Sequence, residues 1–361
     1  MKKQHFFYAL FAYICAVLYL ASTTPISPHE ANIYYNVPGL VSFCMHIGEN
    51  LMGGFLGLRV LFILFGFMAL WLFYSLSRKH FIRETDTYLA TTIFMILPGI
   101  LTGVALANVA MIVLPLVLLF VLLYESEKRL FLPFIMLALF FIHEASMIFF
   151  VALLLYGVMH KDKQLAIGSL AFLGAFIYLA KGIEIGGRPS GHFIEIFGLY
   201  ATVFSPLLFL YFFYAMYRIL LREKKTLLWY ISFTALAFSF LLSIRQRVYI
   251  TDFAPYVMIA VLLMLDTLNH SVRVRLPVFQ KQYRRGFYIV IGSLLISASV
   301  IIFHKQLYQL SSDPSTHFAK RIYEPYILAK ELKSNGISCS AYAKGREVFQ
   351  LRYYNITTCE K

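Results

Sequence analysis

The sequence alternates long apolar runs with short polar segments. A straight helix needs about 20 apolar residues to cross a bilayer, and most of the runs approach that length. The pattern therefore predicts an all-α polytopic membrane protein with about eleven transmembrane helices, of which the short fifth and sixth would be re-entrant or would cross a thinned bilayer. The runs lie at about residues 6–22, 58–77, 87–104, 108–124, 130–142, 145–159, 164–181, 199–218, 227–243, 250–268 and 287–304.

Composition supports this class. The 361 residues are 60% hydrophobic and 14% charged, with a net charge of +14 and a mean hydropathy of +0.72. The basic residues form clusters in alternate connections, as the orientation bias of cytoplasmic loops predicts, so the charge does not indicate nucleic-acid binding. The first run follows MKKQH and lacks a small-residue cleavage site, so we interpret it as a retained helix. The distribution of the basic residues places the amino terminus in the cytoplasm and the loop at residues 23–59 outside.

The polar tail at residues 305–361 follows the membrane domain at residues 1–304. An odd number of spans places it in the periplasm. DPSTHF precedes an expected helix over residues 319–333, ISCSAYA is typical of a strand, and REVFQLRYYN predicts a second helix. We expect a small α/β domain that docks on the membrane domain, since so short a segment has little core of its own. Cys339 and Cys359 would pair in an oxidising compartment, but spacing alone does not decide it.

The first outer loop, residues 23–59, concentrates ionisable groups. Glu30, next to His29, is a candidate general base if the membrane face partly desolvates it. Alternatively the two residues simply begin an interfacial helix, because acids favour the first turn. Arg59 begins the second long helix and either binds a phosphate or extends to the interface.

A second group of candidates lies in SIRQRVYITDFAP. Arg245 and Arg247 stand on a short outer loop against the orientation bias, beside Tyr249. Two guanidiniums there would neutralise a phosphate leaving group, or bind ordinary anionic lipid. Arg188, in the longest later outer loop, would contact substrate or solvent.

His143 and Glu144 interrupt an apolar run in LALFFIHEASMIFF. Ionisable groups are costly in hydrocarbon, so we expect them to face a cavity or to form a turn between two helices. Glu30, His143 and Glu144 are candidate ligands of a divalent cation, although no ligand spacing specifies a metal.

The order of these motifs resembles a known family. HEANIYY, GENLMGGFLGLR, RQRVYITDFAPY and a tail containing LRYY follow one another as in the membrane glycosyltransferases of the C-type fold (GT-C). The branch is the one related to dolichyl-phosphate-mannose protein mannosyltransferases and to bacterial aminoarabinose lipid A transferases. The resemblance covers most of the chain and implies a GT-C-like membrane domain with a small periplasmic domain.

The resemblance also implies roles for individual residues. Glu30 matches the second acid of the family's first-loop motif, and His29 replaces the first. Arg59 matches the family's structural or phosphate-binding arginine, and Glu49 precedes it in the same segment. Two further positions differ from the family, with Asn108 in place of an acid after the third helix and His143-Glu144 in place of Lys-Gly.

The sequence as a whole predicts a glycosyltransferase of the bacterial inner membrane. It would transfer a sugar from a polyprenyl-phosphate-linked donor to a glycolipid, glycan or protein acceptor on the periplasmic side. Glu30, helped by His29, would be the base, and Arg59, Arg245, Arg247 and His143 would bind the lipid phosphate. A transporter or flippase for lipid-linked sugars and a polysaccharide polymerase are the alternatives. We find no internal symmetry of the kind that favours a transporter.

Overall fold

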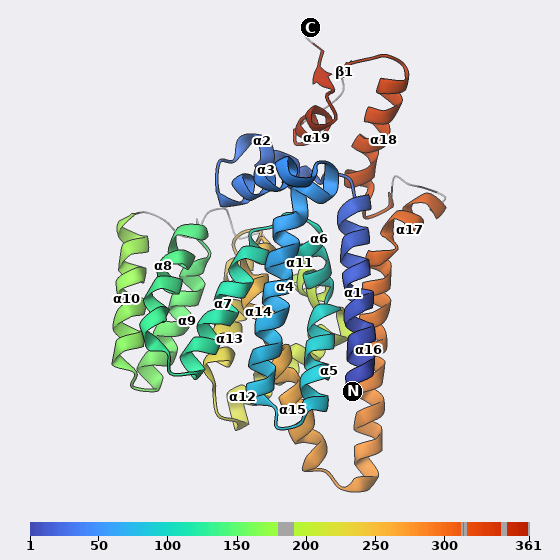
Figure 1. The fold of residues 1–361 in the computed structure, drawn as a ribbon. Coiled ribbons are helices and arrows are strands. Elements are labelled where there is room, and N and C mark those ends of the chain that lie inside the picture. The colour runs from blue at the N-terminus through green and yellow to red at the C-terminus, as the bar shows by residue number, and fades with distance from the viewer. Residues whose placement is uncertain (180–190, 312, 314–315, 341–344, 360–361) are drawn as a thin grey trace. The chain divides into compact units, whose positions relative to one another are not determined.

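The computed structural model describes residues 1–361 except 180–190, 312, 314–315, 341–344 and 360–361 (Figure 1). Its helices are those of a multi-pass membrane protein. Three are long and apolar enough to cross a membrane, namely α1 (Lys3–Thr23), α4 (Gly54–His80) and α16 (Pro277–Ile302). Shorter apolar helices are α7 (Ala110–Glu125), η1 with α8 (Arg129–Phe131 and Leu132–Ile142), α9 (Ser146–Met159), α10 (Lys163–Tyr178) and α13 (Leu227–Ser243).

Three further apolar runs are bent pairs of helices. The chain turns by 56° between α5 (Glu84–Met95) and α6 (Pro98–Ala105), and by 44° between α14 (Ile250–Met258) and α15 (Val261–Arg273). If each bent pair is one span, six spans meet the length and hydropathy criteria within the described residues. The predicted total of about eleven stays a prediction.

The third bent pair corrects the expectation of one helix over residues 199–218. The chain turns by 105° between α11 (Phe193–Phe204) and α12 (Pro206–Arg222). Ser205, at the break, has φ of +88°, and Pro206 then begins α12. Proline has no N–H to donate and suits the first turn of a helix, so a new helix begins at Pro206. The apolar pattern continues across this break and therefore does not reveal it.

The contacts of the chain divide it into two compact units, which we describe separately. The first comprises Met1–Phe11, Gly66–Leu101 and Val109–Ala298, and the second comprises Ala12–Phe65, Thr102–Asn108 and Ser299–Lys361. The tail thus shares a unit with the first outer loop. The predicted domain boundary between residues 304 and 305 is not tested by this division.

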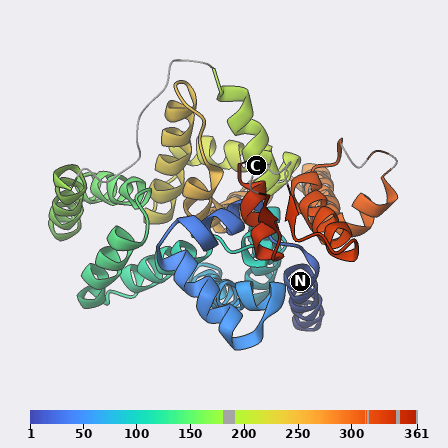
Figure 2. The ribbon, with the colours of Figure 1, turned by 90° about the horizontal axis from the view of Figure 1, so that it is seen from above.

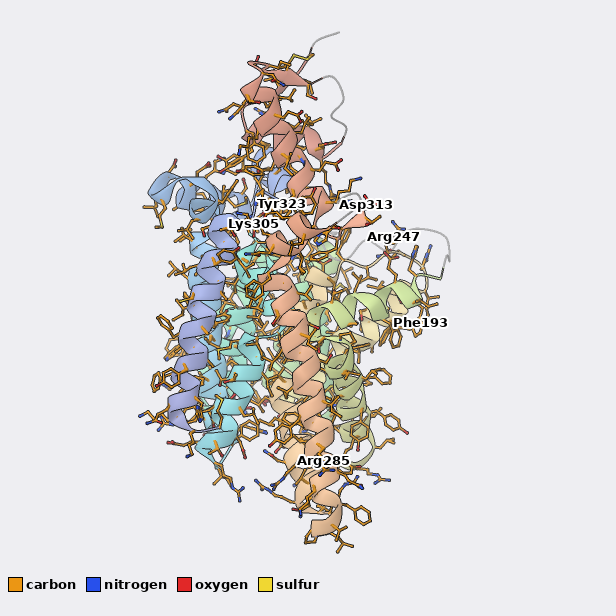
Figure 3. The ribbon with its side chains drawn as sticks, turned by 90° about the vertical axis from the view of Figure 1, so that its right-hand side faces the viewer. Phe193, Arg247, Arg285, Lys305, Asp313 and Tyr323 are labelled. Atoms are coloured by element: carbon orange, nitrogen blue, oxygen red, sulfur yellow. A yellow bond between two sulfur atoms is a disulfide. The ribbon has the colours of Figure 1, made fainter. Side chains whose placement is uncertain are left out.

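The first unit is a bundle of apolar helices. α9 packs against α10 and α13, α13 against α14, and α14 against α7, while α15 contacts both α12 and α5. Figure 2 shows α8, α9 and α10, in green, side by side. The bundle has two ends, which we name the Arg247 end and the Arg285 end after two residues that lie far apart along its helices (Figure 3).

The second unit contains the short helices of the first outer loop and of the tail. They are α2 (Pro28–Asn36), α3 (Leu40–Met52), α17 (His304–Leu310), α18 (Lys320–Ser334) and α19 (Glu347–Tyr353). α3 packs directly on the first turns of α4, since a Cβ on Gly48 would overlap the carbonyl oxygen of Gly57. α19 packs against α2, and Gln350 Nε2 donates to the carbonyl oxygen of Ile26 at 2.9 Å. The tail is therefore held by the loop that precedes α2.

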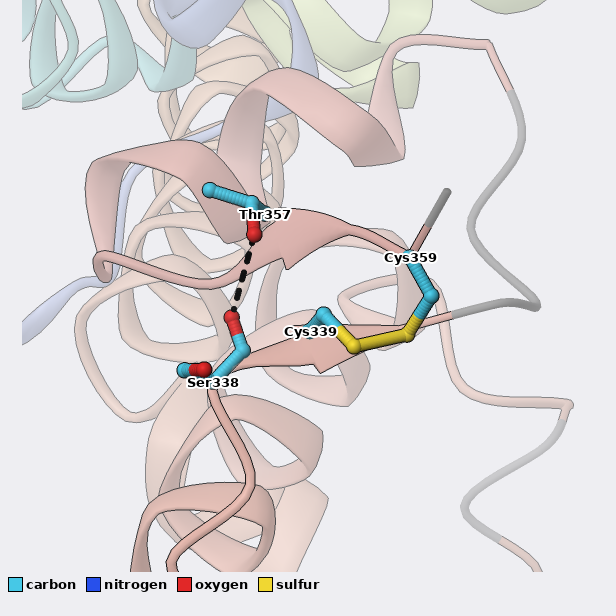
Figure 4. The surroundings of a disulfide bond; sticks show 4 residues. All are labelled: Ser338, Cys339, Thr357 and Cys359. Atoms are coloured by element: carbon cyan, nitrogen blue, oxygen red, sulfur yellow. Dashed lines mark hydrogen bonds between the residues drawn. A yellow bond between two sulfur atoms is a disulfide. The ribbon is translucent and has the colours of Figure 1, made fainter. Parts of the chain in front are cut away.

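The tail follows its predicted order of elements. The two predicted helices are α18 and α19, and the predicted strand is described only at β1 (Cys339–Ser340), which pairs in parallel with β2 (Thr357–Thr358). Cys339 and Cys359 form a disulfide, and Thr357 Oγ1 donates to the carbonyl oxygen of Ser338 at 3.3 Å (Figure 4). The disulfide left open by the sequence is thus formed.

Candidate functional site

Glu30 lies in a capping box at the start of α2. The backbone N–H of Glu30 donates to Ser27 Oγ at 3.2 Å, and the backbone N–H of Ser27 donates to Glu30 Oε2 at 2.9 Å. Ser-x-x-Glu satisfies two donors at a helix start in this reciprocal way. Glu30 therefore lies in the first turn of α2, where the alternative interpretation of the sequence places it.

Arg59 reaches Glu30 from the first turns of α4. Its Nε and Nη2 donate to the two carboxylate oxygens of Glu30 at 2.9 Å each. Its other N–H groups donate to the carbonyl oxygens of Ala21 at 3.0 Å, Thr24 at 2.7 Å and Pro25 at 3.0 Å. A guanidinium has five N–H donors, so Arg59 has no donor left for a ligand.

The carboxylate is equally occupied. The backbone N–H of Ala107 donates to Glu30 Oε1 at 2.8 Å, and both Glu30 and Arg59 are 0% exposed. Burial opposes ionisation, but the charge of Arg59 and the N–H groups of Ser27 and Ala107 outweigh it and hold the pKa of Glu30 below its ordinary value. We call Glu30 and Arg59 the sealed pair.

The sealed pair differs from the open site that the sequence predicts on the first loop, and the predicted roles of its residues stay predictions. The sequence predicted a base at Glu30 and a phosphate ligand at Arg59, whereas in this geometry both groups hold the loop to α4 and neither contacts solvent. His29 is exposed on α2 next to Glu30, and Asn108 directly follows Ala107. The carboxylate and the guanidinium of this pair are thus occupied by contacts within the protein.

Glu49 lies elsewhere in the second unit, among tyrosines. It is partly exposed on α3 and accepts hydrogen bonds from the phenols of Tyr34 and Tyr353. Burial and Glu49 together raise the pKa of both phenols, so both remain donors. The Tyr34 ring stacks on His46 with centroids 4.1 Å apart, and Arg352 lies 4.5 Å from the ring centroid of Tyr35. Glu49 therefore joins α2, α3 and α19.

The Arg247 end of the first unit carries a half-buried histidine. His143, in the turn between α8 and α9, places Nε2 3.2 Å from Oδ1 of Asp252 on the first turn of α14. The two atoms are close enough for an ion pair but are not aligned as a hydrogen bond. The side chains are 18% and 25% exposed, although Nε2 of His143 is itself buried. Glu144 is exposed beside it.

Arg247 lies at the same end, five residues before Asp252. Its Nε is 3.5 Å from Glu195 Oε2, and His192 Nδ1 is 3.0 Å from the same oxygen. The side chain of Arg247 is 76% exposed and that of Glu195 is 46% exposed. Figure 3 shows Arg247 with Phe193, the first residue of α11, at this end. We call Arg247 and Glu195 the open pair.

The other predicted residues at this end are exposed. Arg245 and Tyr249 flank Arg247 on the segment between α13 and α14. Arg188 lies outside the described residues. The structure thus brings His143 to the segment that carries Arg245, Arg247 and Tyr249, while Glu30, Glu49, Arg59 and Asn108 belong to the second unit.

Two partners were missed from the sequence. They are Asp252, the partner of His143, and Glu195, the partner of Arg247, neither of which is among the predicted site residues. Both had a local signal: Glu195 follows His192 at i,i+3 on a helix start, and Asp252 is the first-turn acid after a basic loop. Within the described part of the chain, no three His, Cys, Asp or Glu side chains are grouped to hold a metal ion, including Glu30, His143 and Glu144.

No family model matches the chain, and no curated protein matches it. Solved structures do. ArnT from Cupriavidus metallidurans in the apo state matches with a TM-score of 0.56 and 14% identity, over 96% of this chain and 73% of that one. ArnT from the same organism bound to undecaprenyl phosphate matches with a TM-score of 0.59 and 12% identity, over 98% of this chain and 75% of that one. The predicted resemblance to the aminoarabinose lipid A transferases is confirmed at the level of the fold.

Proposed function

We propose that the chain is a membrane glycosyltransferase that takes a sugar from a polyprenyl-phosphate-linked donor. The observation that carries this proposal is the fold match to ArnT, which covers 96% of this chain for the apo structure and 98% for the structure bound to undecaprenyl phosphate. Polyprenyl phosphate is the group that such a donor would release, so a fold that holds it suits the transfer. The sugar stays open, and so does the acceptor, whether glycolipid, glycan or protein.

The lipid phosphate would bind at Arg245 and Arg247. Both guanidiniums are exposed at the Arg247 end, and the open pair is held by a single exposed ionic contact at 3.5 Å. Exposed pairs contribute about 0–1 kcal/mol, so a phosphate can replace Glu195 at little cost. Guanidinium–phosphate contacts are strong because they combine charge with two parallel hydrogen bonds.

The base would be His143, positioned by Asp252. Imidazole is the most common general base in enzymes, and a carboxylate beside it orients the ring. His143 would take the proton of the acceptor hydroxyl while that oxygen bonds to the anomeric carbon. The bond from the anomeric carbon to the phosphate oxygen breaks, and its electron pair leaves with the lipid phosphate, where Arg245 and Arg247 neutralise the charge. This assignment replaces Glu30, whose acceptor positions are filled.

The Arg247 end would face the periplasm of a bacterial inner membrane. Most basic residues lie in the connections that the orientation bias assigns to the cytoplasm, which supports this orientation. The disulfide of Cys339 and Cys359 supports an oxidising compartment for the tail. A divalent cation remains an untested expectation.

The test is to incubate the purified protein with polyprenyl-phosphate sugars and candidate acceptors, and to follow free lipid phosphate by mass spectrometry. We expect release of lipid phosphate together with a glycosylated acceptor. The variant with Arg245→Gln and Arg247→Gln should lose about 10- to 100-fold in rate. Arg285→Gln is the control, because it removes a single charge of the same kind at the other end of the unit.

The outcomes separate the alternatives. Donor moved across a membrane with no bond broken would establish a transporter, and a lengthening glycan would establish a polymerase. Equal rates for the double variant and for Arg285→Gln would remove Arg245 and Arg247 from the site.

A further inference from the structure

The Arg285 end of the first unit has two cavities lined by arginines. The first, of about 410 Å³, is lined by Arg218, Arg222 and Arg275 together with Tyr214 and Tyr217. The second, of about 580 Å³, is lined by Arg83, Arg273 and Arg284 together with Asp86 and apolar side chains such as Leu265 and Ile291. Asp86 is the one acid among the residues that line the two cavities. Both cavities are therefore strongly positive.

A third cavity, with a mainly apolar lining, adjoins the second. It has a volume of about 370 Å³ and lies between α12, α15 and α16. Leu268 and Phe287 line it and also line the second cavity. Tyr283 lines it as well, and the guanidinium of Arg275 from the first cavity lies 3.5 Å from the centroid of that ring. We call the three cavities together the arginine groove.

The arginines of the groove differ in what holds them. Arg218 is fixed, because its Nε donates to Glu223 Oε1 at 3.1 Å and its Nη1 donates to Ser271. Arg273 and Arg284, which line the second cavity, are exposed, and neither forms an ion pair with a carboxylate of the described residues. Guanidiniums that no acid neutralises favour an anion.

Orientation bias alone would explain basic residues at this end, but not their arrangement. That bias needs only positive charge, and exposed residues such as Lys163 and Arg285 supply it without lining these cavities. Here arginines line two cavities, one of them stacks on Tyr283, and an apolar cavity adjoins the second. Basic pockets of this kind between membrane helices bind lipid headgroups.

We propose that the arginine groove binds an anionic glycerophospholipid. The phosphate would contact Arg273 and Arg284 in the second cavity, and a hydrocarbon chain would occupy the adjoining apolar cavity at Leu268 and Phe287. The occupant comes from the surrounding bilayer, because α16 exposes Tyr288, Ile289 and Leu295 beside the groove, where acyl chains would lie. The inference does not depend on the transfer reaction, since no residue of the proposed site lines the groove.

The test compares lipids on the full-length protein purified and delipidated in a neutral detergent. Native mass spectrometry counts bound phosphatidylglycerol, and a thermal shift follows the stabilisation. We expect phosphatidylglycerol to bind and phosphatidylcholine to bind much more weakly. The variant with Arg273→Gln and Arg284→Gln should bind phosphatidylglycerol about 30-fold more weakly, whereas Arg285→Gln, which removes a neighbouring exposed charge outside the groove, should bind as the wild type does.

Four results would overturn the proposal. Equal binding of phosphatidylcholine would remove the need for an anion, and an equal loss with Arg285→Gln would reduce the groove to general surface charge. Inorganic phosphate producing the full thermal shift would show an anion site without a lipid chain. Preference for polyprenyl phosphate at the groove would assign it to a different lipid.

Discussion

Two carboxylate–guanidinium pairs in this chain use the same chemical groups in opposite surroundings. Glu30 and Arg59 are 0% exposed and joined by two hydrogen bonds of 2.9 Å. Glu195 and Arg247 are 46% and 76% exposed and approach to 3.5 Å. The sealed pair has every donor and acceptor satisfied, whereas among the described residues the open pair retains unfilled ones. Residue type alone does not distinguish an ion pair that is internally satisfied from one that is open to a ligand. The burial of the two side chains and the number of their hydrogen bonds make that distinction.

The difference follows from the cost of removing charges from water. That cost is several kcal/mol per ion, and a buried pair is stable only if its remaining lone pairs and protons are also satisfied. Carbonyl groups of residues 21–25 and N–H groups of Ser27 and Ala107 satisfy them here. A substrate that used Glu30 would have to displace these bonds, while one that used Arg247 displaces water and a single contact.

The largest expected effect is on folding and comes from the sealed pair. Glu30→Gln leaves the charge of Arg59 buried without a counter-charge, and Arg59→Met does the same to Glu30. Each should destabilise the protein by about 3–5 kcal/mol, measured as loss of monodisperse protein on size exclusion and as a lowered Tm. Arg247→Gln is the matched control and should change stability by less than about 1 kcal/mol.

The double variant sharpens this prediction. Glu30→Gln with Arg59→Met removes both charges at once, so it should be less destabilised than the sum of the two single variants. A Glu30→Gln protein as stable as the wild type but without transfer activity would contradict the structural role and restore the base predicted from the sequence.

The next largest effect is on catalysis and comes from His143. Removal of a general base lowers rates by about 10²- to 10⁴-fold, so His143→Asn should reduce kcat by that factor. Its Tm should stay near the wild-type value, because His143 is in a turn and partly exposed. Glu144→Gln, the exposed neighbour, should retain full activity. Loss of kcat in Glu144→Gln with an active His143→Asn would exchange the two assignments.

The sequence predicted the class, the positions of most helices and the elements of the tail. Apolar runs report which segments leave water, so they found α13 at its observed bounds and α1 and α4 to within about four residues. They do not report where a run bends, and the break at Ser205 was therefore missed. The polar motifs found Glu30 and Arg59 but could not show that both are satisfied internally, because Ala21, Thr24 and Ala107 contribute backbone groups that no side-chain pattern reveals.

A smaller effect of opposite sign is expected at the open pair. Glu195→Gln removes the carboxylate that competes with a lipid phosphate for Arg247, so the KM for the donor should fall. Exposed pairs contribute at most about 1 kcal/mol, which limits the change to about fivefold. Steady-state kinetics at low and high salt measures it, and the difference should shrink at high salt because exposed charges are screened. An increase in KM would mean that Glu195 positions Arg247 for the phosphate instead of competing with it.

The smallest expected effect is a pH dependence from a second buried group, His304. Its Nε2 lies 3.0 Å from the hydroxyl of Tyr323, and its Nδ1 lies 2.8 Å from the carbonyl oxygen of Ile301. Burial lowers the pKa of His304, the hydrogen bond to Ile301 opposes this, and the nearby positive charges of Arg59 and of other basic groups lower it further. The folded protein therefore holds this imidazole neutral at a pH where the unfolded chain would protonate it.

The sign of the effect follows from proton linkage. The unfolded chain binds more protons at His304 than the folded protein does below the ordinary histidine value of about 6.5. Stability from this group is complete above that pH and declines as the pH falls towards the lowered pKa of the folded state. Thermal unfolding at pH 7.5 and pH 5.5 should show the decline in the wild type, and His304→Gln, which cannot be protonated but keeps a donor and an acceptor, should reduce it. The same slope in both proteins would exclude His304 as the source of the acid sensitivity and would assign it to carboxylates whose pKa is lowered in the folded protein, such as Glu30 of the sealed pair.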